Sequence, residues 1–121
     1  MKYKKPQDGE FIQKKDYSKT ILFNLADFKE KGHMLQVVTI PPQTKQRGHV
    51  HHIQTEVEYV LEGEAEFYMN GEYIHTKAGD ALITEPGDKH FVWNKTDAEC
   101  KILVFKINFP EGEEDSVWLE E

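Results

Sequence analysis

The segment EAEFYMNGEYIHT, residues 64–76, constrains the fold more than any other stretch of the chain. Asn70-Gly71 lies between two runs in which apolar and polar residues alternate, and both residues tolerate the positive φ angles of a two-residue hairpin turn. The alternation has the period of a strand with one buried face. The sequence therefore predicts a tight antiparallel hairpin at this point.

The rest of the chain repeats this pattern. Short runs rich in β-branched and aromatic residues recur at intervals of about 8 to 12 residues, with turn residues between them, which is typical of an all-β sandwich or small barrel. The predicted strands are residues 33–40, 57–63, 64–69, 72–76, 81–84, 90–94 and 99–109. A helical turn is expected only within residues 26–32 or 17–28.

Length and charge limit the function classes. A chain of 121 residues predicts a single domain over residues 1–121, with a core over about 35–109, an N-terminal arm over 1–30 and an acidic tail over 110–121. No segment has the apolar length of a membrane helix or the pattern of a signal peptide, so we expect a cytoplasmic protein. The net charge of -7 argues against nucleic acid as a partner.

Histidines concentrate just before one predicted strand, in HVHHIQTEVEYVLEG, residues 49–63. Residues two apart on a strand share a side, so His49 and His51 are expected to converge while His52 points away. A carboxylate from Glu56 and a further imidazole from His90 would complete a mixed site suited to Mn, Fe, Co, Ni, Cu or Zn. Two histidines at this spacing also occur on solvated strands, so the pair alone is a weak indication.

The wider spacing is more specific. Residues 49–63 read H-x-H-x4-E-x6-G, and residues 79–94 read G-x6-P-G-x2-H-x3-N. This pattern resembles the two motifs of the cupin superfamily, and the resemblance to small single-domain cupins covers about residues 35–109. It implies an all-β, cupin-type double-stranded β-helix, or jelly-roll barrel. It also implies one divalent transition metal with four ligands: His49, His51, Glu56 and His90.

Two positions depart from the family pattern. The leading glycine of the first motif falls on Gln43, and the first proline of the second motif falls on Glu85. Neither position is a metal ligand in the family, so the departures concern loop shape. By the same resemblance Asn94 occupies a structural position.

Three imidazoles and one carboxylate around a divalent ion leave a net positive charge and two open positions on an octahedral metal. We therefore expect a small anionic or sugar-like ligand, such as a hydroxy acid, keto acid, dicarboxylate or uronic acid. Arg47 has the strand parity of His49 and is a candidate to hold a substrate carboxylate; the alternative is an exposed rim residue. Glu58 has the parity of Glu56 and is a candidate catalytic proton acceptor; the alternative is a solvent-facing or intersubunit charge.

Three functions are compatible with these features. The leading hypothesis is a metal-dependent enzyme, either an oxygenase or an isomerase or lyase. The second is a metal-assisted binding protein without turnover, and the third is a structural or sensory barrel that works as a dimer. The resemblance implies a homodimer, because small cupins are commonly dimeric.

Overall fold

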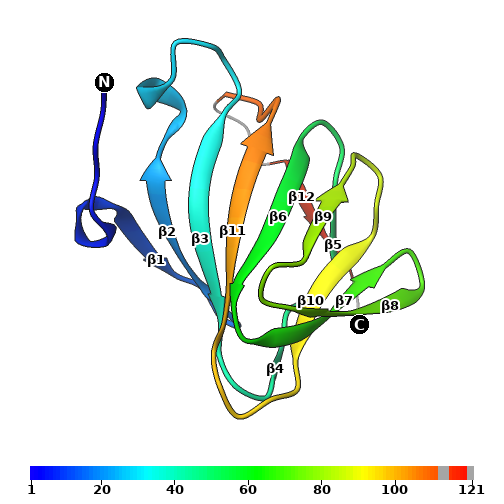
Figure 1. Cartoon of the computed structure of the whole chain (residues 1–121). Helices are drawn as coiled ribbons and strands as arrows, with labels where there is room; N and C mark the ends of the chain where they lie inside the picture. The colour runs from blue at the N-terminus through cyan, green and yellow to red at the C-terminus, as the bar shows by residue number, and fades with distance from the viewer. Residues whose placement is uncertain (112–114, 120–121) are drawn as a thin grey trace.

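The structure is a computed structural model that describes residues 1–111 and 115–119. Its strands form two antiparallel sheets, and Figure 1 shows the first running across the view from β1 to β9. In order, this sheet contains β1 (Glu10–Gln13), β2 (Ser18–Phe23), β3 (Met34–Ile40), β11 (Cys100–Ile107), β6 (Thr55–Glu62) and β9 (Ala81–Thr84). The second contains β12 (Ser116–Trp118), β5 (His49–His51), β10 (His90–Asn94), β7 (Glu64–Met69) and β8 (Glu72–Lys77), with β4 (Thr44–Lys45) beside β10.

The predicted all-β architecture and the predicted hairpin are both confirmed. Asn70 and Gly71 connect β7 to β8 with φ angles of 50° and 93°, the combination that a tight hairpin turn requires. Strands β3, β6, β9, β10 and β11 also lie where the alternation predicts them. A 3-10 turn, η2 (Leu25–Asp27), falls within the stretch expected to hold a helical turn, and another, η1 (Pro6–Asp8), precedes β1.

The ends of the chain differ from the expectation. Residues 1–30 were expected to form an arm outside the core, but β1 and β2 extend the first sheet through pairing with β3. The predicted acidic tail over 110–121 includes β12, which pairs with β5, while residues 112–114 and 120–121 lie outside the described part of the chain. The edge strands β1 and β12 have only four and three residues, which is too short for an alternation to be recognised.

The space between the sheets holds the apolar core. Its buried members are Val38, Ile40, Val60, Ala65, Phe67, Val92, Cys100, Ile102 and Val104. Cys100 lies within the predicted strand 99–109 and is fully buried, and burial raises the pKa of its thiol to about 11. Among the described residues, no helix is long and apolar enough to cross a bilayer.

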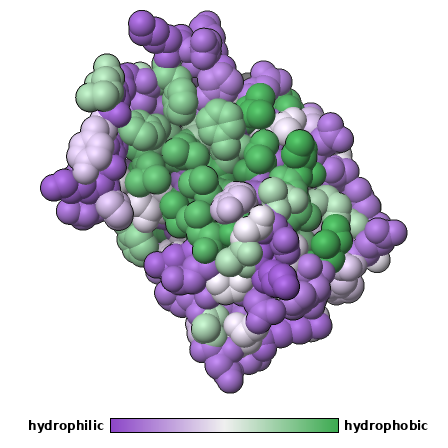
Figure 2. All heavy atoms as spheres, viewed as in Figure 1, coloured by the Kyte–Doolittle hydropathy of each residue, from purple (hydrophilic) through white to green (hydrophobic). Residues whose placement is uncertain are grey.

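The outer surface of the first sheet is also apolar. Figure 2 shows a broad hydrophobic area over β3, β11 and β6. The strand register places Leu103 between Val37 and Tyr59, so their side chains share this face. Tyr59 and Ile83 are 44% and 59% exposed.

Candidate metal centre

Three histidines from two neighbouring strands of the second sheet converge inside the barrel. His49 and His51 lie on the same side of β5, and His90 begins β10 opposite His49 in the register. Their ring centroids lie 4.1 Å (His49–His90), 5.1 Å (His49–His51) and 5.1 Å (His51–His90) apart. All three are buried, and one nitrogen from each lies within 4.8 Å of the others.

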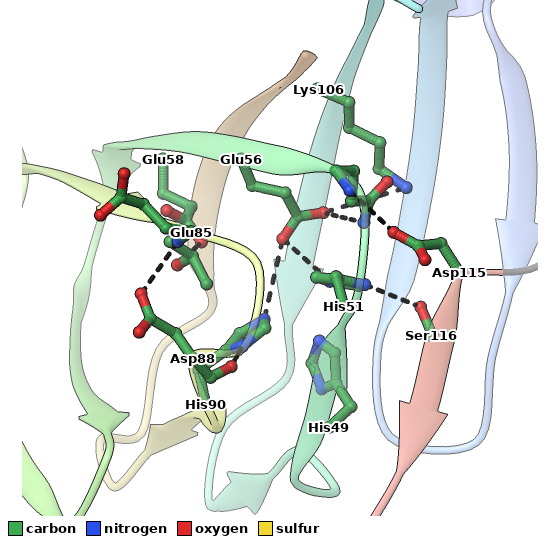
Figure 3. Close-up of polar contacts among 12 residues, drawn as sticks. His49, His51, Glu56, Glu58, Glu85, Asp88, His90, Lys106, Asp115 and Ser116 are labelled. Carbon is green, nitrogen blue, oxygen red and sulfur yellow. Dashed lines mark hydrogen bonds and ion pairs between the residues drawn. The ribbon is translucent and has the colours of Figure 1, made fainter. Parts of the chain in front are cut away.

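One nitrogen of each imidazole is held by the protein. Nδ1 of His49 lies 3.1 Å from the Arg47 carbonyl oxygen, and Nδ1 of His90 lies 2.8 Å from the Asp88 carbonyl oxygen. Because a carbonyl only accepts, each of these two Nδ1 atoms carries a proton, so Nε2 presents a lone pair whenever the ring is neutral. Nδ1 of His51 lies 3.3 Å from Ser116 Oγ (Figure 3), and this hydroxyl can donate or accept.

The Nε2 atoms face the cavity in a form that suits a metal. Those of His51 and His90 are buried and make no hydrogen bond within the described residues. Burial, followed by the nearby His90 ring, lowers the pKa of His49 to about 3, so this imidazole is neutral at pH 7. Neutral imidazoles whose other nitrogen is anchored to a carbonyl or hydroxyl are the usual form of a histidine metal ligand.

Glu56 lies beside this cluster on β6 of the facing sheet. Its Oε1 is 3.4 Å from His51 Nε2 and 3.8 Å from His90 Nε2, and its Oε2 is 3.9 Å from Lys106 Nζ (Figure 3). Burial acts to raise the pKa of this carboxyl, but the two imidazoles and the lysine together hold it well below its usual range. Glu56 is therefore an ionised carboxylate next to the imidazole nitrogens.

Glu58 lies two residues after Glu56 on β6, and its pKa is shifted in the opposite direction. It faces inward, as its parity predicts, and is 4% exposed. Burial, and secondarily the charge of Glu56, raises its pKa well above the ordinary value, although Thr84 Oγ1 donates a hydrogen bond to Oε2 at 2.8 Å. Its other oxygen makes no hydrogen bond within the described residues. Its surroundings in the cavity wall therefore favour the protonated form of Glu58 over the carboxylate.

Arg47 does not lie where strand parity places it. Residues 46–48 separate β4 from β5 and are not strand, so the alternation counted back from His49 is lost. Gln46 takes the inward position, while the exposed Arg47 side chain donates to the Leu119 carbonyl oxygen at 2.9 Å. Arg47 borders a separate surface hollow with Lys45 and Trp118. The expectation that it faces the histidine cavity is therefore corrected.

The segment after β11 supports the site, which sequence reasoning missed. Asp115 accepts hydrogen bonds from the backbone N–H groups of residues 52, 53 and 54, at 3.3, 3.0 and 2.8 Å. This holds the irregular turn that leads from β5 to Glu56. His52 is exposed, in the outward orientation that its parity predicts, and the Trp118 ring lies 4.9 Å from that of His49.

These groups surround a cavity of about 160 Å³. Its polar walls include residues that the sequence analysis did not single out: Lys14, Tyr17, Lys19, Gln36, Gln46, Lys106 and Ser116. A signal for Lys106 was present, because it shares the parity of Ile102 and Val104 within β11 and pairs with Glu56 in the register. Buried Nε2 atoms that make no hydrogen bond within the described residues and lie beside an ionised carboxylate are a donor set that fits a divalent transition metal.

Comparisons with known proteins identify a family and a relative of this chain. A family model described as the cupin domain matches residues 36–106. An oxalate-binding protein from Thermotoga maritima is 30% identical over 77 residues, 64% of this chain, and the chain spans 64% of that relative.

Solved structures share the fold. A crystal structure from Thermotoga maritima, described as a predicted oxalate decarboxylase, matches with a TM-score of 0.76 and 24% identity over 87% of this chain and 97% of that chain. A polyketide cyclase from Streptomyces resistomycificus matches with a TM-score of 0.79 and 21% identity, over 100% of this chain and 88% of the other. At these identities the structures report on the fold alone. The cupin domain model matches the chain from β3 into β11, which is more than half of its length, so the protein belongs to the cupin domain family.

Proposed function

We propose that this protein binds one divalent transition metal and uses it to hold a small anionic metabolite for acid–base chemistry. His49, His51 and His90 are the imidazole ligands, and Glu56 is the fourth ligand. The observation that carries the proposal is the set of three anchored rings whose ligand nitrogens lie within 4.8 Å of one another.

The charge of the cavity supports an anionic ligand. Three of its lining residues are lysines, Lys14, Lys19 and Lys106, whereas the acidic lining residues are Glu56 and Glu58, and burial raises the pKa of Glu58. This local positive excess occurs in a chain with a net charge of -7. A cavity of this sign concentrates anions from solution. Similarity to an oxalate-binding protein points to carboxylates as the ligand class.

Glu58 is the group proposed to move a proton. A buried carboxylic acid with a raised pKa is suited to donate a proton at neutral pH. A metal at the histidines would supply a Lewis acid for a carboxylate or carbonyl oxygen of the ligand. Glu58 would protonate a carbon or oxygen of that ligand, which favours an isomerase, lyase or decarboxylase-type reaction over oxygenation.

Metal titration of the purified protein tests the first step. Calorimetry with Mn²⁺, Co²⁺ and Zn²⁺ after chelator treatment is expected to give one site per chain. His51→Ala is expected to lose about a hundredfold or more in affinity, because removing a ligand has a larger effect than removing one of its supports, which costs 10–100-fold. The matched control is His75→Ala, since His75 is exposed on β8 between Glu64 and Glu66. Equal loss in both variants would contradict the proposal.

A binding protein without turnover is the second candidate, favoured by the similarity to the oxalate-binding protein. The metal-loaded protein would be incubated with oxalate and small keto and hydroxy acids, and products followed by NMR. Conversion that is lost in Glu58→Gln supports the enzyme. Tight binding with unchanged ligand, in both wild type and variant, supports the binding protein instead. Oxygen consumption that requires Fe²⁺ or Mn²⁺ would restore the oxygenase hypothesis.

We also infer that the apolar outer surface of the first sheet supports a homodimer. Contiguous exposed apolar surface of this kind marks interaction sites, and a twofold pair of identical faces is the commonest arrangement. Sedimentation across a concentration series is expected to show a dimer that Tyr59→Lys dissociates. Ile53→Lys, at an exposed position outside this sheet, is the control. A wild-type monomer at all concentrations would refute the inference.

A further inference from the structure

Lys106 lies on the wall that faces the histidine cluster. It is the cross-strand partner of Glu56 in the register of β11 and β6, and it is 7% exposed. Its ammonium group lies 3.9 Å from Glu56 Oε2 and 4.7 Å from the centre of the Phe109 ring. Figure 3 shows Lys106 and the histidines approaching Glu56 from different sides. The cavity therefore contains a buried cation that is separate from the imidazoles.

A second polar group lies on the same wall. Gln36 of β3 is 4% exposed and lines the cavity, and the register places it beside Val104, diagonally next to Lys106. One end of its amide, Oε1, makes no hydrogen bond within the described residues. A buried polar atom without a partner carries a free-energy cost that a bound ligand or water relieves. Because Oε1 only accepts, this position suits a water molecule or a ligand hydroxyl, and the carboxylate falls to Lys106.

The size of the cavity suits a small ligand. A cavity of about 150 Å³ accommodates benzene, a molecule of six heavy atoms. The cavity here is about 160 Å³, so a ligand of roughly six to eight heavy atoms fits it. Dicarboxylates of two to four carbons have this size.

We propose that Lys106 is a second anchoring point, which binds a distal carboxylate of a small dicarboxylate held at the histidine cluster. This inference rests on the proposed function and specifies its substrate class: dianions of two to four carbons, in preference to monoanions of equal length. An ammonium ion with three donors binds a carboxylate by charge-assisted hydrogen bonds. Lys106 is then a specificity residue, in the role that the sequence analysis had given to Arg47.

Salt-bridging to Glu56 alone is the competing role for Lys106, and metal affinity separates the two. If Lys106 does not position Glu56, removing its positive charge should leave metal affinity unchanged or make it tighter, because the repulsion between like charges is lost. If Lys106 only positions Glu56, its loss weakens metal binding and all ligands together. If it anchors the ligand, the loss falls on dianions alone.

Calorimetry tests the inference. Metal affinity is measured first, without carboxylates, and then oxalate, glycolate, succinate and butanoate are titrated into the Mn²⁺-loaded protein. The wild type is expected to prefer oxalate to glycolate, and succinate to butanoate, by about ten- to a hundredfold. Lys106→Met is expected to abolish that preference while metal and monoanion affinities persist, and Lys106→Arg to restore part of it. Lys101→Met is the matched control, since Lys101 lies on the same strand outside the cavity.

The possible outcomes are distinct. Equal dianion preference in wild type and Lys106→Met overturns the inference but leaves the metal proposal intact. A parallel loss of metal, monoanion and dianion binding in Lys106→Met also overturns it and assigns Lys106 to positioning Glu56. A wild-type protein that takes up no metal overturns the proposed function, and this inference falls with it.

Discussion

Along β11, the inward-facing side chains change from Cys100, Ile102 and Val104 near one end of the strand to Lys106 near the other. Their partners on the neighbouring strands also change from apolar to charged, since Ile40 pairs with Cys100 and Glu56 pairs with Lys106. One end of the barrel is a dry core, where burial provides stability. The other end buries charged and unpaired polar groups at a cost in stability, as functional sites commonly do. Fold stability and chemistry are thus segregated along a single strand.

Truncation in the apolar end is expected to have the largest effect. Ile40 has no exposed surface, so Ile40→Ala is expected to lower the free energy of unfolding by about 2–5 kcal/mol through lost burial and a residual cavity. Urea denaturation measures this loss. Metal affinity of the folded variant is expected to match wild type. Ile53→Ala, at a 42% exposed position beside the polar end, is the control and should cost far less. Similar losses of unfolding free energy in Ile40→Ala and Ile53→Ala would contradict the idea that the apolar end provides the stability.

Gly63, which ends β6 at the apolar end, gives the next largest effect. Its φ is 83°, and a Cβ there would lie 2.4 Å from the Glu99 carbonyl oxygen, so Gly63→Ala forces a backbone shift. Gly79 has a φ of 100°, and a Cβ at this residue would have no neighbouring atom within 4 Å. Gly79→Ala should therefore cost only the left-handed penalty, about 1–2 kcal/mol. Thermal unfolding of both variants is expected to show the larger loss for Gly63→Ala, and equal losses would contradict a steric cause.

The two glutamates of the polar end should respond to pH with opposite signs. The pKa of Glu58 is raised by folding, so its contribution to stability is present below about 4.5 and is lost as pH rises through its folded pKa. In metal-free protein, Glu58→Gln is therefore expected to be more stable than wild type at pH 8, on the order of 1 kcal/mol or more, because the amide never has to ionise in the cavity wall. Near pH 4 the advantage should disappear.

Glu56→Gln is the counterpart. The pKa of Glu56 is lowered by folding, so its contribution is present above about 4.5 and is lost as pH falls through the folded pKa. This variant should be less stable than wild type at pH 7, and the deficit should shrink in acid. Urea denaturation between pH 3 and pH 8 measures both variants. If the stability of both variants relative to wild type changed in the same direction with pH, the opposite pKa shifts of Glu58 and Glu56 would be contradicted.

Gln43 gives the smallest expected effect. Its φ is 53°, at the position where the family motif has glycine, and its side chain donates to the Lys95 carbonyl oxygen at 2.8 Å and to Asp97 at 3.1 Å. Gln43→Gly relieves the left-handed conformation but loses these bonds, so the net change in unfolding free energy should be under about 1 kcal/mol. Gln43→Ala loses the bonds without relief and should be less stable than the glycine variant. The reverse order would show that strain is absent here.

Local patterns in the sequence predicted the central strands, because alternation and turn residues such as Asn70-Gly71 act over a few positions. Parity likewise predicted the inward Glu58, which lies within β6, and the outward His52, which directly follows β5. It failed for Arg47, since the chain leaves β-geometry at residues 46–48. Lys106 was overlooked because its importance depends on a cross-strand partner fifty residues away, which alternation within one strand does not reveal.

The distant support of the imidazoles has a consequence for biosynthesis. His51 is held by Ser116, which follows it by 65 residues, and the turn after β5 is held by Asp115. A nascent chain that has emerged only as far as β11 already contains every proposed metal ligand and the carbonyl groups that anchor His49 and His90, but it lacks Ser116 and Asp115. The chain would then bind metal at full affinity only after the segment that carries β12 has packed against β5, which is later than formation of the barrel during translation.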